Sequence, residues 1–419
     1  MLNRTQAPEI HAIDRIDFVA PEKHHISKTC VFFHMKDVPN DTARFDLYFN
    51  AGKCHSKGGV SSFVNALLLS GTDTKSAVQI QDEINRLGGF FESGVSMENA
   101  VVSMYCLREN VLPIFRILMD AIQNVSFHEK EVSEMLSDRK QKFRINQEKV
   151  SFLAQQHFCE RLFASNVLYA APMTLDQYDT VTIDELRIFH ERYYKQGLEK
   201  VVLVGNVDPD EADQIKAMAV SLSSTIETRF DDTIKHQPGH VHIPKEGALQ
   251  SAVRVGRMLF NKKHPDYIDF LVLNTILGDY FGSRLMTNIR EDKGYTYGIG
   301  SVISELGETG YFMVATEVGS DKREATLKEI QFELERLQQT LVSEDELDLV
   351  KSYMIGQLLK SADGPYAMTD LFLSAVIHGK DLAFYNEVIQ RVHAIDAQRI
   401  QELATSYLQW ENMTIVTVG

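Results

Sequence analysis

The sequence carries an internal repeat, because residues 181–205 match residues 395–419 position by position. Both segments have the pattern of an amphipathic helix followed by a short β-branched strand, and both end in Val-Gly. A repeat of this kind limits the chain to folds built from two copies of one unit. The matching pairs are Val181 with Ile395, Leu186 with Ile400, Phe189 with Leu403, Tyr193 with Tyr407, Val201 with Ile415, Val202 with Val416, Val204 with Val418 and Gly205 with Gly419.

The 419 residues exceed the length at which a single hydrophobic core keeps growing, so two domains are expected. Each half alternates strand and helix patterns, which predicts an α+β fold: a tandem duplication of two similar domains, each a mixed β-sheet packed with helices. The segment 227–248 is polar and contains Pro238, Gly239 and Pro244, which is typical of a linker. We therefore predict domains at 1–226 and 249–419, joined by a linker at 227–248.

The formal net charge of −15 disfavours nucleic acid or an anionic membrane as a partner, because both are bound through clustered Lys and Arg. The N-terminal residues lack the apolar core of a signal peptide, and no run of about 18 apolar residues occurs, so a cytoplasmic protein without membrane insertion is expected. Cys30, Cys54, Cys106 and Cys159 are widely spaced and form no CxxC pattern. They are predicted to be free buried thiols.

The segment Gly59–Thr72 predicts an amphipathic helix. On its polar side Ser62 and Ala66 are one turn apart, as two metal ligands would be, and Asn65 stands where a general base would reach a metal-bound water. The chemistry does not suit these roles: a serine hydroxyl is a poor zinc ligand, an amide takes no proton from water at neutral pH, and alanine has no donor atom. An ordinary buried helix explains the segment equally well. The apolar stripe consists of Val60, Phe63, Val64, Leu67 and Leu68.

This segment resembles the zinc-site helix of the M16, or pitrilysin-like, peptidases, which reads G-x-A-H-F-L-E-H-x-L-F-x-G-T. The resemblance places Ser62 at the first His, Asn65 at the Glu and Ala66 at the second His of that motif. It therefore implies a degenerate zinc site. The positions that match the motif are Gly59, Phe63, Leu68, Gly71 and Thr72.

The third zinc ligand of the family is a glutamate on a later helix, and counting along the chain places Lys142 there. A protonated lysine cannot bind zinc. A shift of the alignment by several residues would bring Glu134 or Glu148 to this position, but two of the three ligands would still be missing. We therefore expect no metal in this chain. The remaining candidate ligands, expected to be solvated linker side chains, are His236, His240 and His242.

The segment Leu277–Ile299 is similar to a second M16 motif, L-G-G-x-x-x-S-R-L-x-x-x-L-R-E-x-x-G-L-x-Y-x-I. In the family its Arg and Tyr hold the substrate backbone and the developing oxyanion, so the resemblance assigns these roles to Arg290 and Tyr297. Without the resemblance, the same two residues would be interpreted as a helix cap and a packed strand residue. The family also implies that the strand within Phe90–Met104 takes an extended substrate peptide along its edge.

Together these features imply the metallohydrolase fold of the mitochondrial-processing-peptidase type, in the short two-domain class that assembles as dimers. The leading hypothesis is a non-catalytic, peptide-binding subunit that supplies substrate and oxyanion contacts to a partner's active site. The substrate would be a peptide or small unfolded protein, and the partner an M16 subunit with an intact H-x-x-E-H motif and its zinc, or a second copy of this chain. The alternative is a scaffold or binding protein with no proteolytic role, like the core subunits of a respiratory complex. In either case we expect the chain to be inactive alone.

Overall fold

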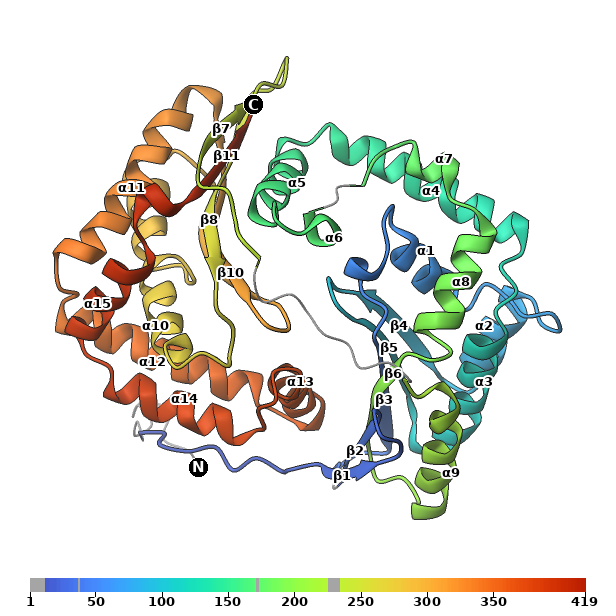
Figure 1. The fold of residues 1–419 in the computed structure, drawn as a ribbon. Helices are drawn as coiled ribbons and strands as arrows, with labels where there is room; N and C mark the ends of the chain where they lie inside the picture. The colour runs from blue at the N-terminus through green and yellow to red at the C-terminus, as the bar shows by residue number, and fades with distance from the viewer. Residues whose placement is uncertain (1–11, 37, 171–172, 225–233) are drawn as a thin grey trace, which may run out of the picture.

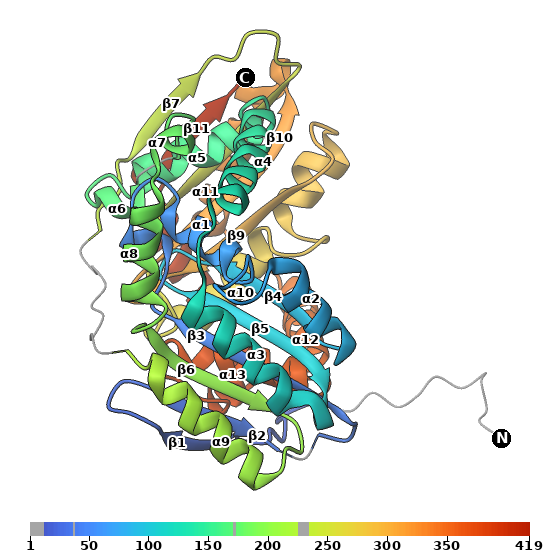
Figure 2. The same ribbon diagram turned by 90° about the vertical axis from the view of Figure 1, so that its right-hand side faces the viewer.

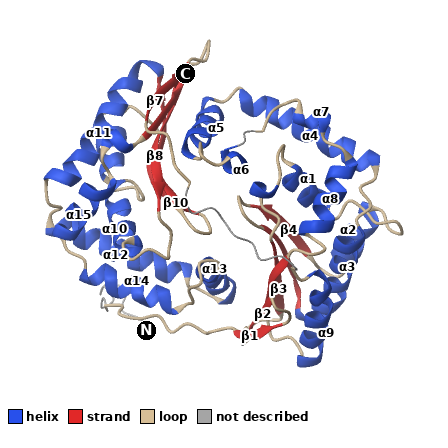
Figure 3. Cartoon of the chain, in the orientation of Figure 1, coloured by secondary structure: helices blue, strands red, loops and turns tan. Residues whose placement is uncertain are grey.

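The computed structural model describes residues 12–36, 38–170, 173–224 and 234–419. These residues form two halves, each a β-sheet with helices packed on it, and the halves face each other side by side (Figure 1, Figure 3). The described strands form one sheet in the order β1-β2-β6-β3-β5-β4 and another in the order β7-β11-β8-β10-β9. Their bounds are β1 (Glu22–His25), β2 (Val31–Met35), β3 (Thr42–Phe49), β4 (Phe90–Val95), β5 (Ala100–Leu107), β6 (Leu198–Val204), β7 (Gly239–Ile243), β8 (Gln250–Leu259), β9 (Ile299–Glu305), β10 (Gly310–Gly319) and β11 (Thr414–Val418).

The two sheets share one arrangement of strands, which confirms the predicted α+β fold with two similar domains. In each sheet one pair of described strands is parallel, β2 with β6 and β7 with β11, while the other neighbours are antiparallel. The repeated sequence segments form α8 (Ile183–Tyr193) with β6 and α15 (Ala397–Tyr407) with β11. The helix and strand that match in sequence thus occupy equivalent places in the two halves.

The helices of the first half cover its sheet through apolar faces. Figure 2 shows α3 (Val111–Asn124) and α9 (Pro209–Ala219) lying across one face of the sheet. The start of α2 (Ala77–Arg86) is fixed by a capping box, in which the Ser76 hydroxyl accepts from the Gln79 N–H and the Gln79 side chain accepts from the Ser76 N–H. The other helices described here are α1 (Val60–Leu67), α4 (Glu129–Gln147), α5 (Val150–Leu162), α6 (Val167–Ala170) and α7 (Gln177–Thr180).

The second half is built around α10 (Tyr267–Leu277), which is buried along its whole length among β9, α12, α14 and α15. Two long helices, α11 (Arg323–Gln339) and α12 (Glu344–Ser361), follow β10. They are followed by α13 (Pro365–Val376) and α14 (Ala383–Ala394). Within the described ranges, every helix is too short or too polar to cross a membrane.

Each half covers part of the other half's sheet with one helix. Helix α5 packs on β8 and β11, where the Arg254 guanidinium donates to the Ser151 carbonyl at 3.4 Å and to the Gln155 side chain at 3.3 Å. Helix α13 packs on the first sheet, where the rings of Phe33 and Phe372 are 4.9 Å apart. Because helices cover both faces of each sheet, a central strand such as β6 is buried and apolar from Val201 to Val204.

The predicted linker at 227–248 is only partly a linker. Residues 227–233 lie outside the described residues, whereas Gly239–Ile243 forms β7 and pairs with β11. His240 and His242 are exposed, as expected, but they lie on a strand and not in a linker. Each hydrogen-bonds to the Thr417 hydroxyl, at 3.1 Å and 3.0 Å respectively. His236 also lies against the second half, with Nε2 2.9 Å from the Asn412 carbonyl. The His-Val-His-Ile alternation has the period of a strand, but flanking proline and glycine residues concealed it.

The four cysteines are free, as predicted, although Cys159 is only partly buried. Burial raises the pKa of the Cys30, Cys54 and Cys106 thiols to about 12. These thiols therefore stay protonated at neutral pH, which makes them poor nucleophiles and poor metal ligands.

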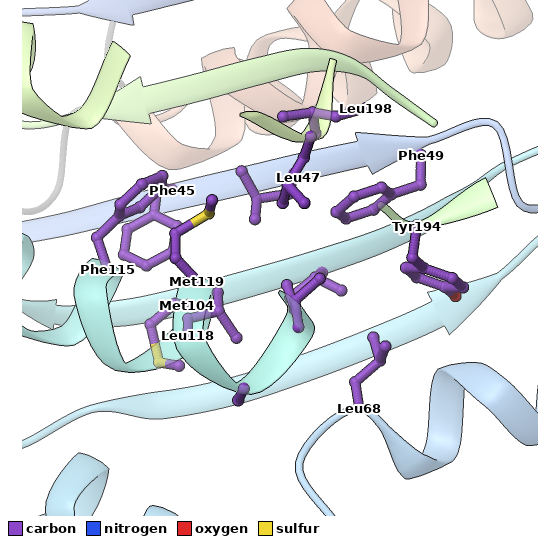
Figure 4. Close-up of a cluster of buried hydrophobic side chains, with 14 of the residues drawn as sticks. Phe45, Leu47, Phe49, Leu68, Met104, Phe115, Leu118, Met119, Tyr194 and Leu198 are labelled. Carbon is purple, nitrogen blue, oxygen red and sulfur yellow. The ribbon is translucent and has the colours of Figure 1, made fainter. Parts of the chain in front are cut away.

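The first half has a single large core between its sheet and its helices. Figure 4 shows Phe45 and Leu47 of β3 facing Phe115 of α3, and the two phenylalanine ring centroids are 5.1 Å apart. Leu68, directly after α1, and Tyr194, directly after α8, enter the same cluster. Burial of each large apolar side chain contributes about 1.5–3 kcal/mol, so this cluster fixes the position of α1 on the sheet.

Candidate functional site

Helix α1 is held by its apolar stripe and by the glycine that precedes it. Phe63, Val64 and Leu67 are buried in the first core, which confirms the predicted stripe. Gly59 has φ of 76°, and a Cβ at this position would lie 2.7 Å from the Met173 sulfur. The backbone conformation therefore favours glycine here, and a larger residue would also displace the flexible end of Met173.

The three positions of the degenerate motif point to three different environments. Ser62 is partly buried and lines a cavity beside α1, whereas Ala66 is exposed. Asn65 is 6% exposed and turns into the core, where its Nδ2 donates to the Tyr194 hydroxyl at 3.0 Å. Burial raises the pKa of Tyr194, so the phenol is neutral and can accept this hydrogen bond. The side chain at the general-base position therefore has a structural partner and does not face the cavity.

Lys142 is exposed on α4 and does not line the cavity beside α1. The α4 residues that do line it are Arg139 and Phe143, one turn apart. The Arg139 guanidinium lies over the Phe63 ring at 5.9 Å from the centroid. Sequence reasoning missed both residues, although their spacing of four along a helix indicates a shared face. Because helix rotation decides which residues face α1, a residue count alone could not place this position.

We call the space beside α1 the α1 cavity; it has a volume of about 320 Å³. Residues from α1, α4, α5 and the loops around α6 and α7 line it. The rings of Phe143 and Phe152 are 5.5 Å apart, and those of Phe63 and Tyr178 are also 5.5 Å apart. Met97 and Met173 add sulfur-containing walls. Polar and apolar atoms contribute about equally to the lining, so the cavity combines aromatic and sulfur-containing walls with polar groups.

The α1 cavity does not fit a zinc ion. Among the described residues, no group of three or more His, Cys, Asp or Glu side chains is arranged to hold a metal. Of the three motif positions, only Ser62 lines the cavity, and a neutral hydroxyl does not replace imidazole or carboxylate as a ligand. The donor set is thus incompatible with hydrolysis through a metal bound at α1.

Arg290 belongs to a π-helical segment, Met286–Asp292, whose Ile289 is buried in the second core. The Arg290 side chain is partly buried, and its guanidinium lies over the Phe281 ring at 4.5 Å from the centroid. This guanidinium forms no hydrogen bond or ion pair with another described residue. The cation is therefore oriented by a ring and keeps its N–H donors available.

Tyr297 lies in the loop before β9, and its side chain is 95% exposed. The loop itself is anchored, because the Thr296 hydroxyl donates to the Glu317 carbonyl at 2.8 Å and accepts from the Thr316 hydroxyl at 2.9 Å. Tyr297 borders a shallow depression that includes Arg254. Neither Arg290 nor Tyr297 lines the α1 cavity. Within one chain, these two side chains therefore do not share a cavity with α1.

Strand β4 forms an open edge of the first described sheet, since it pairs with β5 on one side only. The strand is largely exposed, and α1 packs beside it. An unpaired edge is the geometry to which an extended peptide adds as a further strand. Addition of a substrate peptide at β4 stays a prediction.

Both halves of the chain match models of the same peptidase family. Residues 32–169 match the family described as "Insulinase (Peptidase family M16)", and residues 180–354 match "Peptidase M16 inactive domain". The chain belongs to the M16 peptidase family. The first M16 match contains α1 and α4, which line the α1 cavity, and the second contains Arg290 and Tyr297.

Individual M16 relatives are distant in sequence. The chain is 25% identical over 361 residues to an uncharacterized zinc protease of Rickettsia felis, covering 82% of this chain and 84% of the relative. It is 21% identical over 411 residues to the probable mitochondrial-processing peptidase subunit beta of Arabidopsis thaliana, covering 90% and 74%. A solved structure of a peptidase M16 inactive domain from Pseudomonas fluorescens superimposes with a TM-score of 0.87 at 20% identity, covering 96% and 98%. That last likeness shows the shared fold.

Proposed function

We propose that this chain is a non-catalytic, peptide-binding subunit of a dimeric M16-type zinc metallopeptidase, which supplies Arg290 and Tyr297 to its partner's active site. The observation that carries the proposal is the exposure of Tyr297, 95%, on an anchored loop of a chain whose own α1 lacks zinc ligands. A tyrosine held almost entirely in solvent is suited to become buried against another chain. In this role the two residues would act on a substrate bound by the partner.

The chemistry of the pair supports this role. A phenol O–H and a guanidinium N–H both donate hydrogen bonds to a carbonyl oxygen that becomes negative during peptide hydrolysis. Preorganisation decides how much such donors contribute, because a fixed donor costs no reorganisation during the reaction. The Thr296 and Thr316 hydrogen bonds fix the loop of Tyr297, and the Phe281 ring orients Arg290.

The test is a peptidase assay on the complex of this chain with an M16 chain from the same genome that has an intact H-x-x-E-H motif. We expect Arg290→Ala or Tyr297→Phe to lower the rate by about 100- to 1,000-fold, the usual effect of losing one preorganised donor. The matched control is Arg86→Ala, because Arg86 is exposed on α2 and lines neither site. Thermal stability and complex formation should change little in all three variants.

Two results would contradict the proposal. One is an active complex that keeps its full rate in both variants. The other is unfolding of the chain by Tyr297→Phe, which would make the tyrosine structural. If no complex with any intact M16 chain cleaves peptides, a scaffold role without proteolysis becomes the better description. The isolated chain is also expected to carry no stoichiometric zinc by metal analysis.

A further inference from the structure

The α1 cavity combines apolar walls with a positive charge. Five aromatic side chains line it, those of Phe63, Phe143, Phe152, Tyr169 and Tyr178. The charged side chains among the described lining residues are Lys53 and Arg139, and Asp and Glu are absent from this lining. In a chain with a net charge of −15, a concave site with only basic charged groups is unusual. A lining of this kind attracts an anion with an apolar body.

Arg139 is the group in the cavity that most needs a ligand. It is partly buried, and desolvation lowers its pKa. Its interactions with described residues are the contact with the Phe63 ring and a Coulombic interaction with Tyr178, and no carboxylate pairs with it. A guanidinium that has lost water without gaining a counter-ion is stabilised by a bound anion, and its planar fork fits a carboxylate.

The dimensions and surroundings of the cavity indicate the ligand. Its volume of about 320 Å³ is at the lower end of the range for small-ligand pockets, about 300–1,000 Å³, which suits one or two amino-acid residues. Met97, from the hairpin between β4 and β5, forms part of its wall. The hairpin at the end of β4 therefore reaches the cavity, and the unpaired edge of β4 can hold the backbone of an extended peptide.

We propose that the α1 cavity binds the carboxyl-terminal residue of a peptide, with its apolar side chain among the aromatic rings and its carboxylate on Arg139. Ser62 lines the same cavity and can donate a hydrogen bond to the carboxylate. Loss of the zinc ligands would thus have converted a hydrolytic site into a binding site. This inference does not rest on the proposed role of Arg290 and Tyr297, because it requires only the single chain.

The experiment measures fluorescence anisotropy of an amino-terminally labelled decapeptide ending in Phe, with a free carboxylate or with a carboxamide. The purified chain is used alone, so a missing partner does not affect the result. We expect the carboxylate peptide to bind about ten- to one-hundred-fold more tightly than the amide, because a buried charge-assisted contact is lost in the amide. Arg139→Gln should abolish this preference, and Arg139→Lys should restore part of it.

The matched control is Arg144→Gln, since Arg144 is exposed on the same helix and does not line the cavity. This variant should keep the full preference for the carboxylate, and thermal melting of every variant excludes unfolding. Equal binding of acid and amide, or an unchanged preference in Arg139→Gln, would overturn the proposal. Competition by N-acetylphenylalanine as strong as competition by the unlabelled peptide would overturn the peptide as ligand, because the cavity would then recognise a free small acid.

Discussion

Asn65 has a structural role at a position that the resemblance to the M16 motif aligns with a general base. In the M16 motif this position holds the general base, but here the amide is 6% exposed and donates to the Tyr194 hydroxyl. Both groups lie in an apolar core, where an unpaired polar group is costly. The Asn65 amide therefore takes part in the hydrogen bonding of the core.

Tyr194→Phe tests this hydrogen bond. The change removes the acceptor and leaves the Asn65 amide buried without it, so we expect the free energy of unfolding to fall by about 1–3 kcal/mol. Equilibrium unfolding in urea measures the loss. Tyr193→Phe is the matched control, because Tyr193 is only partly buried and stacks on His55 through its ring, which phenylalanine retains. An equal effect of the two substitutions would argue against a specific role for the Asn65 contact.

At the scale of elements, one carboxylate joins the hairpins of the two halves. Glu98 lies between β4 and β5 and is 5% exposed. One of its oxygens accepts from the Tyr169 hydroxyl at 2.6 Å, and the other accepts from the Gly307 N–H between β9 and β10 at 2.5 Å. Burial raises the pKa of Glu98 above its ordinary value of 4.5, despite these two donors. The protonation of Glu98, and with it the stability of the contact between the two hairpins, is therefore expected to depend on pH.

Glu98→Gln tests this linkage. A carboxyl with a raised pKa in the folded state binds its proton more tightly there than in the unfolded chain. Its contribution to the free energy of unfolding is therefore fully present below about pH 4.5 and is lost as pH rises through the folded pKa. Glutamine can form both contacts but does not titrate. We expect the stability difference, wild type minus variant, to decrease between about pH 4 and pH 7 in urea unfolding. The control is Glu92→Gln, exposed on β4, and an identical pH trend in both variants would contradict the assignment to Glu98.

At the scale of the whole molecule, each half depends on the other, because α5 packs on the second sheet and α13 packs on the first. Phe372 of α13 and Phe33 of β2 are both 4% exposed, although they come from different halves. Arg254 of β8 likewise reaches backbone and side-chain oxygens of α5. Because both sheets would expose an apolar face without these helices, the two halves should unfold together.

Assembly is the prediction that belongs to this scale. If the chain pairs with a second M16 chain, exposed side chains such as Tyr297 become buried, and we expect an interface of more than about 2,000 Å², as in obligate dimers. Light scattering should then give the mass of a dimer, either of this chain or with its partner. A monodisperse monomer at micromolar concentration, with and without an M16 partner, would contradict this expectation.

The sequence by itself determined the features that depend on local pattern and on repetition. The repeat of 181–205 at 395–419 predicted two equivalent units, and the period of apolar residues predicted α1. The residues at 62, 65 and 66 predicted a degenerate zinc site, because Ser, Asn and Ala carry neither an imidazole nor a carboxylate.

Only the tertiary structure decided which way side chains face and which distant segments meet. It turned Asn65 into the core, put Arg139 in the α1 cavity while Lys142 stayed exposed, and added β7 to the second sheet. It also placed α5 and α13 on the opposite halves. The physical reason is that a helix's rotation about its axis and a strand's choice of neighbour are set by packing with residues far away in the chain. Local periodicity contains no information about those contacts.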